Sequence, residues 1–517
     1  MSTRRRSLLA ALVAVVAAMV TLGAAEVVAL FVSPASSPLA AVGSFVIDIV
    51  PPWVKDAAIA LFGTGDKVAL LVGLGLMLLV LAALVGVLEL RRPPFGAIAL
   101  AIIGLIALTT AVTRAEATAL WGLPTAVGTA LGVLVLRLGM RRLRSWIAVP
   151  DTQPMQRSLS RRGFIGFASA SAGAALVAGV AARMVNGAST AVNTVRAALK
   201  LPVPAVAAPP IPAGSSFDID GLAPLVTPNL DFYRIDTAIV VPVVRAAGWK
   251  LRIVGEVENE IEITFEELLA LPMIETYVTL TCVSNEVGGG LIGNAKWMGY
   301  PIRELLARAK PKAGADMVLS RSVDGFTAGT PLSVLMEEDR DSILAVSMNG
   351  EALPLEHGFP VRMVVPGLYG YVSATKWVTE LKLTSFAKET AYWTDRGWSA
   401  KGPIKLSSRI DVPGYAAIVP REPLTLAGVA WAQHTGVSAV EFRIDKQGEW
   451  MPATLAEAIS DDTWVQWTAQ WTPTEAKVYA IEVRATDANG TTQGGVWEQP
   501  APNGSEGWHT ITIEVRE

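Results

Sequence analysis

The chain has 517 residues, 51% of them apolar, with one cysteine, three histidines and a mean hydropathy of +0.42. The single cysteine excludes an intramolecular disulfide framework, and the length predicts more than one domain. Residues 1–200 carry 18 Lys and Arg against 7 Asp and Glu, whereas the rest of the chain carries 25 against 39. Because the basic part is also the apolar part, the charge pattern excludes a soluble single-domain protein and indicates a membrane protein with no nucleic-acid partner.

Five apolar stretches in the basic part are long enough to cross a bilayer as helices. Basic clusters at 4–6, 91–92 and 137–144 fall on one side of these spans, and such clusters face the cytoplasm. The positive clusters therefore predict an N-terminus inside the cell and an exterior location for everything after about residue 185. We expect a four-helix transmembrane domain at 1–145 and a fifth span beyond it. The predicted spans are Leu8–Val32, Val68–Leu88, Phe95–Val112, Ala119–Leu136 and Phe164–Ala182.

Two segments of this half are predicted to serve other purposes. The stretch Phe45–Phe62 is interrupted by prolines and charges, which favours an interfacial element on the outer side. Ser160-Arg161-Arg162-Gly163 leads the fifth span and resembles a twin-arginine export signal, although two ordinary positive-inside arginines would look the same. The Pro-rich stretch Leu201–Ser216 predicts an extended spacer, so residues 146–216 are expected to form the fifth helix and a linker.

The remaining residues predict two exterior domains. From about Phe217 short alternating runs such as Trp249–Gly255 mix with helical stretches such as Arg303–Ala309, which is typical of an α+β domain at 217–398. After Ser399 only strand patterns persist, and their spacing predicts an all-β immunoglobulin-like sandwich at 399–517. The clearest of these strands are Leu424–Trp431, Ala439–Asp445, Tyr479–Thr486 and Thr510–Val515.

The lone cysteine lies at the end of a predicted strand. Thr279-Leu280-Thr281-Cys282 is followed by Val283-Ser284-Asn285-Glu286 and then by three glycines at 288–290, where backbone can approach a large ligand. An isolated cysteine is commonly a small buried hydrophobe, and that interpretation stays open. A thiol at a Gly-rich strand end also suits a soft metal such as copper or molybdenum. Since one thiolate cannot hold a metal alone, a cofactor would have to supply the other ligands.

Four stretches in order give residues 217–517 a resemblance to the sulfite oxidase family of molybdenum-cofactor enzymes. They are Asn229–Asp236, the Cys282 loop, Ser347–Pro354, and His357–Arg362 running through Val365-Pro366-Gly367 to Lys376–Val378. The resemblance implies a molybdopterin-binding catalytic domain followed by an immunoglobulin-like dimerisation domain. It also implies oxygen-atom transfer to or from a small sulfur compound, with molybdenum-molybdopterin as the cofactor.

The resemblance assigns roles residue by residue. Cys282 corresponds to the family's thiolate ligand of molybdenum, and Arg234 to the arginine that reaches the substrate pocket. His357, Arg362 and Lys376 correspond to positions that hold the pterin and its phosphate, which requires cations and N–H donors. For Arg362, set in an apolar strand, the alternative of a solvated surface charge is poor. The implied cofactor contacts are Phe232, Tyr233, Arg234, Ile235, Asp236, Asp324, His357, Arg362 and Lys376.

Departures from the family pattern concern the substrate pocket. The family's pocket tyrosine corresponds to Trp398, the arginine expected after the cysteine is replaced near Val287, and another is missing from Gln499–Pro502. Arg234 remains, with Arg396 as a possible addition. A pocket with one cation and an indole predicts a substrate less charged than sulfite, such as a sulfoxide.

The electrons released or taken up in such a reaction need a second protein. The chain has no Cys-x-x-Cys-His motif, and its histidines all follow residue 201, so we expect no haem in this chain. A separate electron-transfer protein, the membrane, a small-molecule substrate and a homodimer partner through the C-terminal domain are the predicted partners. The alternative is a non-catalytic surface binding or assembly module that keeps the sulfite oxidase fold.

Overall fold

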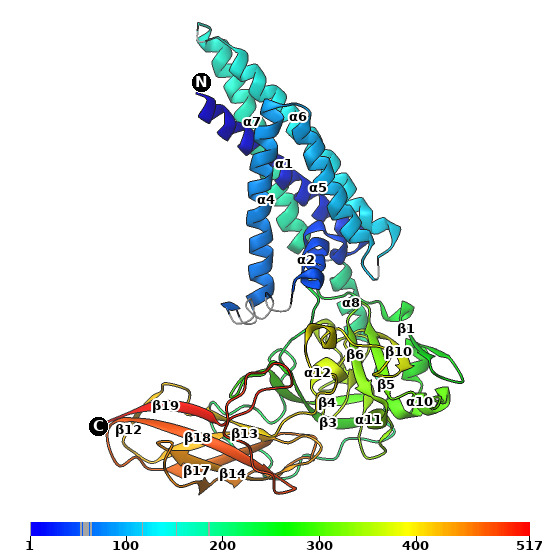
Figure 1. The fold of residues 1–517 in the computed structure, drawn as a ribbon, viewed down its shortest axis with the longest axis vertical. Coiled ribbons are helices and arrows are strands. Elements are labelled where there is room, and N and C mark those ends of the chain that lie inside the picture. The colour runs from blue at the N-terminus through cyan, green and yellow to red at the C-terminus, as the bar shows by residue number, and fades with distance from the viewer. Residues whose placement is uncertain are drawn as a thin grey trace. The chain divides into compact units, whose positions relative to one another are not determined.

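A computed structural model describes residues 2–51, 54, 61, 62, 65–115, 117–150, 152–184 and 187–517 (Figure 1). The chain divides into two units. A helical unit contains Met1–Thr194 and Thr237–Val243, and the second unit contains Val195–Asp236 and Val244–Glu517. The units are described in turn.

Five helices of the first unit are long and apolar enough to cross a membrane, which confirms the five predicted stretches. The largest extensions beyond the predicted bounds are in two of them. Helix α6 continues past Leu136 into the basic cluster, and α7 begins at a proline, so the Arg161-Arg162 pair lies within α7 instead of ahead of it. The helices are α1 (Thr3–Val32), α2 (Pro38–Ile49), α4 (Asp66–Arg91), α5 (Phe95–Val112), α6 (Gly122–Ala148), α7 (Pro154–Met184) and α8 (Gly187–Ala198).

Helix α1 packs against α6 and α7 through small residues. A Cβ atom at Gly132 of α6 would overlap the Thr21 hydroxyl of α1, and one at Gly128 would overlap the Thr21 carbonyl oxygen. Gly23 of α1 faces the Ala175 backbone of α7 in the same way. Glycines at such positions let two helix backbones approach closely, which is the main source of attraction between helices surrounded by lipid.

A short segment from later in the chain belongs to the helical unit. Lys67 Nζ of α4 donates a hydrogen bond to the Ala238 carbonyl oxygen (2.8 Å), and a Cβ atom at Gly43 of α2 would lie 2.6 Å from Ile239 Cδ1. Helix α2 covers the start of the predicted interfacial element Phe45–Phe62. Residues 52, 53 and 55–60 of that element lie outside the described residues, so the interfacial role stays a prediction.

The Pro-rich stretch Leu201–Ser216, which the sequence predicts to be an extended spacer, makes backbone hydrogen bonds to the second unit. The Ala205 N–H donates to the Met273 carbonyl oxygen (2.7 Å), and the Glu275 N–H donates to the Val206 carbonyl oxygen (2.8 Å). An extended chain offers the same backbone groups as a strand, so it can pair with the edge of a sheet. The linker therefore lies along the second unit.

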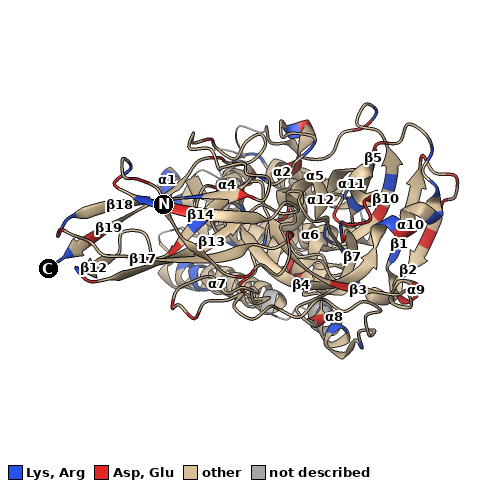
Figure 2. Cartoon of the chain, turned by 90° about the horizontal axis from the view of Figure 1, so that it is seen from below, with Lys and Arg blue, Asp and Glu red and all other residues tan. Residues whose placement is uncertain are grey.

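The first part of the second unit contains two five-stranded sheets. One has the order β2-β1-β10-β5-β6, and the other has the order β3-β4-β7-β8 with β9 beside β7. Charged residues gather on β1, β2, β5 and β10 (Figure 2), while the opposite side chains of β1 are fully buried. The strands are β1 (Lys250–Gly255), β2 (Ile261–Thr264), β3 (Ile274–Thr281), β4 (Ile292–Pro301), β5 (Met317–Ser322), β6 (Thr327–Pro331), β7 (Ile343–Met348), β8 (Glu351–Ala352), β9 (Arg362–Val364) and β10 (Val378–Thr384).

Four short helices accompany these sheets. Helix α10 matches the predicted helical stretch Arg303–Ala309, and its apolar side chains Leu305 and Leu306 are fully buried. Helix α9 begins with a capping box between Thr264 and Glu267. The helices are α9 (Phe265–Leu269), α10 (Ile302–Ala309), α11 (Leu332–Met336) and α12 (Gly370–Ser373).

After Ser399 the structure contains strands in two sheets, ordered β11-β13-β17-β16 and β12-β19-β18-β14-β15 (Figure 1). Side chains from both sheets share one core, in which Leu426, Trp467 and Ile481 are fully buried. The four predicted strands are confirmed as β13, β14, β18 and β19. The strands are β11 (Ser407–Val412), β12 (Ile418–Pro420), β13 (Leu424–Trp431), β14 (Val437–Ile444), β15 (Met451–Pro452), β16 (Thr454–Leu455), β17 (Val465–Trp471), β18 (Val478–Asp487) and β19 (His509–Arg516).

Candidate active site

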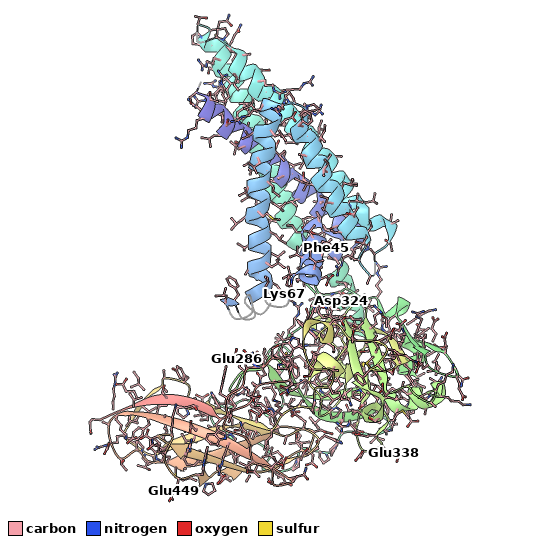
Figure 3. All side chains as sticks on the ribbon, in the orientation of Figure 1. Phe45, Lys67, Glu286, Asp324, Glu338 and Glu449 are labelled. Atoms are coloured by element: carbon pink, nitrogen blue, oxygen red, sulfur yellow. The ribbon has the colours of Figure 1, made fainter. Side chains whose placement is uncertain are left out.

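Cys282 follows the last residue of β3 and begins a closed loop. Its N–H donates to the Leu291 carbonyl oxygen (2.9 Å), and its own carbonyl oxygen accepts the Asn285 N–H (3.0 Å). The Leu291 N–H donates to Asn285 Oδ1 (2.7 Å). These bonds close residues 282–291, called here the cysteine loop, on which Glu286 is labelled in Figure 3. Gly288 has φ of +78°, a conformation that favours glycine.

The Cys282 thiol is buried, and its charged form interacts electrostatically with Tyr233 and Tyr369. Burial raises the pKa of the Cys282 thiol, and hydrogen bonds from Ser284 act in the opposite direction. Burial and the nearby thiolate both raise the pKa of Tyr233, and they raise the pKa of Tyr369 to about 12. A thiol without a cation beside it stays protonated, whereas a bound metal would deprotonate it.

Arg362 on β9 is a buried cation, 5% exposed, as its apolar surroundings in the sequence predicted. Its guanidinium donates to the carbonyl oxygens of Met363 (3.3 Å), His357 (3.3 Å) and Ala374 (3.4 Å) and lies over the Trp297 ring. Among the described residues no carboxylate lies within ion-pair distance of it. Burial without a counter-charge lowers the pKa of Arg362 to about 10. Such a buried charge is costly unless an anion joins it.

Lys376 and Arg234 share one carboxylate. Lys376 Nζ lies 2.6 Å from Asp236 Oδ2 and donates to the Glu356 carbonyl oxygen (3.0 Å). Arg234 Nε donates to Asp236 Oδ2 (2.8 Å), and its Nη2 donates to Oδ1 (3.3 Å). Burial lowers the pKa of Lys376 to about 8, although Asp236 opposes this change. Asp236 therefore fixes the positions of two predicted cofactor cations.

His357 is buried and neutral. Its Nε2 lies 3.0 Å from the Asn229 carbonyl oxygen, and its ring makes an edge contact with Phe232 at 5.6 Å. Burial lowers the pKa of His357 to about 4, with a further contribution from the charge of Arg362. Phe232 is itself buried and stacks on Tyr233, whereas Ile235 is 42% exposed. A neutral imidazole can hold a ligand group through a hydrogen bond without adding charge.

Asp324 lies on the turn between β5 and β6, labelled in Figure 3. Its Oδ1 accepts the Phe326 N–H (3.2 Å), and the preceding Val323 N–H donates to the Trp377 carbonyl oxygen (2.9 Å). This bond attaches the turn to Trp377, the residue that follows Lys376. The predicted cofactor residue Asp324 therefore comes close to the cation group, which we define as His357, Arg362 and Lys376.

Trp398 belongs to an aromatic group near the same site. Its ring lies 6.0 Å from that of Tyr371 and 6.1 Å from that of Trp393. The Tyr371 hydroxyl donates to the Ser399 carbonyl oxygen (2.8 Å). Burial raises the pKa of Tyr371, and so does the charge of Tyr369, which also neighbours Cys282. The Ser399 N–H donates to the Pro502 carbonyl oxygen (3.0 Å), which brings Gln499–Pro502 beside this group.

The structure thus brings most of the predicted residues into one region of the second unit. Tyr233 is electrostatically coupled to both Cys282 and Arg362, which joins the thiol to the cation group. Sequence reasoning did not identify Tyr369 or Trp297 as site residues. A signal for Tyr369 was present, because it stands between the glycines at 367 and 370 inside a matched stretch. Trp297 had no comparable local signal.

The donor set fits an anionic, phosphate-bearing cofactor with a soft metal. Arg362 is a buried cation that lacks a carboxylate, Lys376 supplies a second cation, and His357 supplies a neutral ring. Guanidinium and ammonium groups are the usual ligands of phosphate, and a thiolate binds soft metals. The cation group would hold the pterin and its phosphate, and Cys282 would be the ligand of the metal.

Comparisons with known proteins agree with this donor set. Residues 238–393 match the family model described as "Oxidoreductase molybdopterin binding domain". The chain is 27% identical over 341 residues to mitochondrial sulfite oxidase of Mus musculus, covering 56% of this chain and 62% of that protein. It is 32% identical over 154 residues to the oxidoreductase YuiH of Bacillus subtilis, covering 30% of this chain and 74% of that protein. It thus spans about three fifths of the mouse protein's length and 52% of that of the Drosophila melanogaster sulfite oxidase.

A solved structure shares the fold. The sulfane dehydrogenase SoxCD of Paracoccus pantotrophus superposes with a TM-score of 0.50, over 57% of this chain and 84% of that one, at 23% sequence identity. At this identity the likeness concerns the fold alone. Together with the apolar helices, it places a sheet-rich domain of this fold after five helices long enough to span a membrane.

Proposed function

This chain belongs to the sulfite oxidase family of molybdopterin-binding oxidoreductases, and from that membership we propose that it is a membrane-anchored enzyme acting on a small sulfur compound outside the cytoplasm. The observation that carries the proposal is the buried guanidinium of Arg362, which has no carboxylate partner among the described residues and is coupled through Tyr233 to the Cys282 thiol. A site built this way suits an anion and a soft metal, and molybdenum-molybdopterin would supply both.

The bound cofactor would supply the metal at which an oxygen atom and two electrons are exchanged. The residues of this chain bind and orient it. We assign Cys282 as the thiolate ligand, which loses its proton on metal binding. Arg362 and Lys376 hold the phosphate by charge-assisted hydrogen bonds, and neutral His357 holds the pterin. Asp236 keeps Lys376 and Arg234 in place, so that these two cations are oriented before the anion arrives.

The pocket favours a substrate with less charge than sulfite. Tyr371, Trp393 and Trp398 supply aromatic surface, and the half-buried Val287 stands in the cysteine loop where the family has an arginine. Arg234 is held by Asp236, which offsets its charge. An uncharged sulfoxide or a compound with sulfane sulfur would lose less hydration than a sulfite dianion on entering this pocket.

Metal analysis of the full chain tests the proposal. The chain purified in detergent from cells that make the cofactor should contain about one molybdenum per protein, as the stoichiometry of a single thiolate ligand requires. Cys282→Ser should abolish turnover while circular dichroism stays unchanged. A folded wild-type chain without molybdenum would contradict the proposal, and so would a Cys282→Ser variant with full activity.

The membrane topology is tested with single cysteines in the Cys282→Ser background. We propose that the second unit is exported, with Arg161-Arg162 acting as a twin-arginine signal, and that the loop after α6 stays inside. Ser216→Cys and Ser145→Cys place a thiol at exposed positions on either side of α7. A membrane-impermeant maleimide added to intact cells should label Ser216→Cys and spare Ser145→Cys. The reverse pattern would overturn the assigned sidedness.

Residues 399–517 are proposed to form an immunoglobulin-like sandwich that supports a homodimer, following the cofactor domain at 217–398. Fully buried Trp467 lies in the core shared by its two sheets. A separate electron-transfer protein is the expected redox partner. Light scattering of the detergent-solubilised chain should give twice the mass of one chain, and a monomer at all concentrations would contradict the dimer.

A further inference from the structure

Cys282 follows an edge strand whose outer side is covered by the C-terminal domain. Strand β3 is the last strand of its sheet. Its Thr279 N–H donates to the Asp462 carbonyl oxygen (3.0 Å), and the Trp464 N–H donates to Thr279 Oγ1 (2.8 Å). Gln433 Nε2 donates to Thr281 Oγ1 (3.0 Å). The strand that leads to the cysteine is therefore fixed by residues about 150 to 185 positions later in the chain.

Three further side chains of the C-terminal domain contact the cysteine loop itself. Arg409 Nη1 on β11 donates to the Gly289 carbonyl oxygen (2.9 Å). Ser505 Oγ donates to the Asn285 carbonyl oxygen (2.7 Å). The His509 imidazole, at the start of β19, lies against Gly288, where any Cβ atom would overlap the ring. We call Arg409, Ser505 and His509 the clamp.

Two members of the clamp are themselves held in place. Arg409 Nε lies 2.6 Å from Asp411 Oδ1, and the two side chains are 12% and 10% exposed. His509 Nδ1 accepts the Ile410 N–H (3.0 Å), which fixes the ring and leaves Nε2 as the protonated nitrogen. Because the Arg409 and His509 side chains are already ordered, they lose little further conformational entropy when they restrain the loop.

A displacement of the clamped residues reaches Cys282 directly. Asn285 bonds the Cys282 carbonyl oxygen through its N–H and the Leu291 N–H through its Oδ1, and Leu291 in turn accepts the Cys282 N–H. Asn285 and Gly289 are the two loop residues that Ser505 and Arg409 hold. The same loop carries Val287, which stands where the family has a substrate arginine.

We infer that Arg409, Ser505 and His509 are positioning residues that hold the cysteine loop, so that the C-terminal domain completes the metal-ligand geometry instead of serving only in assembly. The inference rests on the proposed function, in which Cys282 is the molybdenum ligand. Arg409 and Ser505 bond carbonyl oxygens of the cysteine loop, so they act on Cys282 through the loop backbone.

The unique cysteine gives a direct readout of the clamp. In the full chain, purified in detergent from cells that cannot make the cofactor, reaction of N-ethylmaleimide with Cys282 requires the loop to open, because the thiol is buried. Arg409→Met should raise the labelling rate about tenfold, since it removes a charge-assisted hydrogen bond. Ser505→Ala, a smaller change, should raise it about threefold.

Arg443→Met is the matched control. Arg443 lies in the same domain and pairs with buried Glu482 (2.6 Å), as Arg409 pairs with Asp411, but its ring contacts are with Trp450 and Trp508. Its labelling rate should stay within about twofold of wild type, the scatter expected for a change away from the loop. In the cofactor-loaded chain, Arg409→Met should also change the molybdenum(V) electron paramagnetic resonance spectrum, which Arg443→Met should leave unchanged.

Labelling of Ser505→Ala and Arg409→Met at the wild-type rate would overturn the inference, and so would equal acceleration by Arg443→Met. If Arg409→Met fails to fold, Ser505→Ala decides the question alone. Failure of the proposed function looks different. If the wild-type chain contained no molybdenum but the labelling rates still differed between variants, Cys282 would not be a metal ligand, and the clamp would still hold the loop.

Discussion

Lys376 Nζ lies 2.6 Å from Asp236 Oδ2, and the two side chains are only 9% and 5% exposed. Arg234 binds the same carboxylate, and Arg362, also buried, has no carboxylate partner among the described residues. Asp236 is thus the carboxylate that lies within ion-pair distance of both Lys376 and Arg234. Arg362, which no described carboxylate pairs, favours binding of an anion, and the shared pairing makes Asp236 the residue on which the arrangement of Lys376 and Arg234 depends.

Asp236→Asn should destabilise the folded second unit by about 3 kcal/mol, because it leaves Lys376 buried without its counter-charge. The thermal unfolding midpoint of the chain in detergent, followed by tryptophan fluorescence, measures this loss. Glu262→Gln is the control, because it breaks the exposed pair with Lys250 and should cost less than about 1 kcal/mol. Equal effects of the two substitutions would contradict the central role of Asp236.

Anion binding should weaken as the pH rises from 7 to 9. Burial lowers the pKa of Lys376 to about 8 in the cofactor-free chain, so its positive charge is lost across this range. Reconstitution with the cofactor over this range should show weaker binding at pH 9. Lys376→Met should bind more weakly at pH 7 and lose this pH dependence. A variant that keeps the wild-type profile would assign the titration to another group.

Acid should destabilise the fold through His357. Its pKa is about 4 in the folded chain, against an ordinary value of 6.5, so between these pH values only the unfolded chain takes up the proton. The free energy of unfolding should therefore fall by about 3 kcal/mol from pH 6.5 to 4 on account of this residue. His357→Gln should remove most of that decrease in a pH series of unfolding midpoints.

His434→Gln provides the contrast for this series. The hydrogen bond that the His434 ring donates to Asp462 raises the pKa of His434, so its protonation stabilises the folded chain at low pH and that contribution is lost as the pH rises. The variant should therefore leave the acid sensitivity in place or increase it. If His434→Gln reduced the acid-induced fall of the unfolding midpoint as much as His357→Gln does, the effect would come from histidine replacement in general.

Val287→Arg should raise kcat/KM for sulfite about tenfold, because it adds a guanidinium to the cysteine loop beside the proposed metal position. Activity with an uncharged sulfoxide should not increase. Val496→Arg adds the same charge at a side chain that is 75% exposed and should change neither rate. Unchanged sulfite kinetics in Val287→Arg would show that residue 287 does not face the substrate.

Gly132→Leu should prevent close packing of α6 on α1, because the added side chain meets Thr21 and the Ala17 carbonyl oxygen. Overpacking of this kind costs about 1–3 kcal/mol or rearranges the helices. The thermal midpoint of the helical unit should fall. Gly75→Leu on α4 is the control, since no atom lies within 4 Å of its added Cβ position, and it should behave as wild type.

Local patterns were sufficient to predict much of this molecule. The lengths of the apolar stretches predicted five helices, and the alternation in 424–431 and 510–515 predicted strands β13 and β19. The β-branched run before Cys282 and the glycines after it predicted a strand that ends in a loop. Apolar neighbours also predicted the burial of Arg362. Each of these inferences needed only residues close together in the sequence.

Features that depend on distant residues were not predictable in this way. Arg409 is 120 positions from Gly289, and nothing in its own surroundings marks it as a contact of the cysteine loop. The Pro-rich stretch looked like a spacer because its composition does not reveal that Val206 pairs beside Ile274. Sequence also assigned Arg234 to the substrate pocket without showing that Asp236 holds it.

The place of residues 237–243 matters for any study of the second unit without the apolar helices. These residues directly follow Asp236, yet their packing partners include Gly43 and Lys67. A shortened chain that begins after α7 would lack the contacts that Ala238 and Ile239 make with Lys67 and Gly43. It would expose an apolar segment that begins two residues after Asp236. A water-soluble version of the second unit should therefore need polar replacements at 238 and 239 before it can be crystallised.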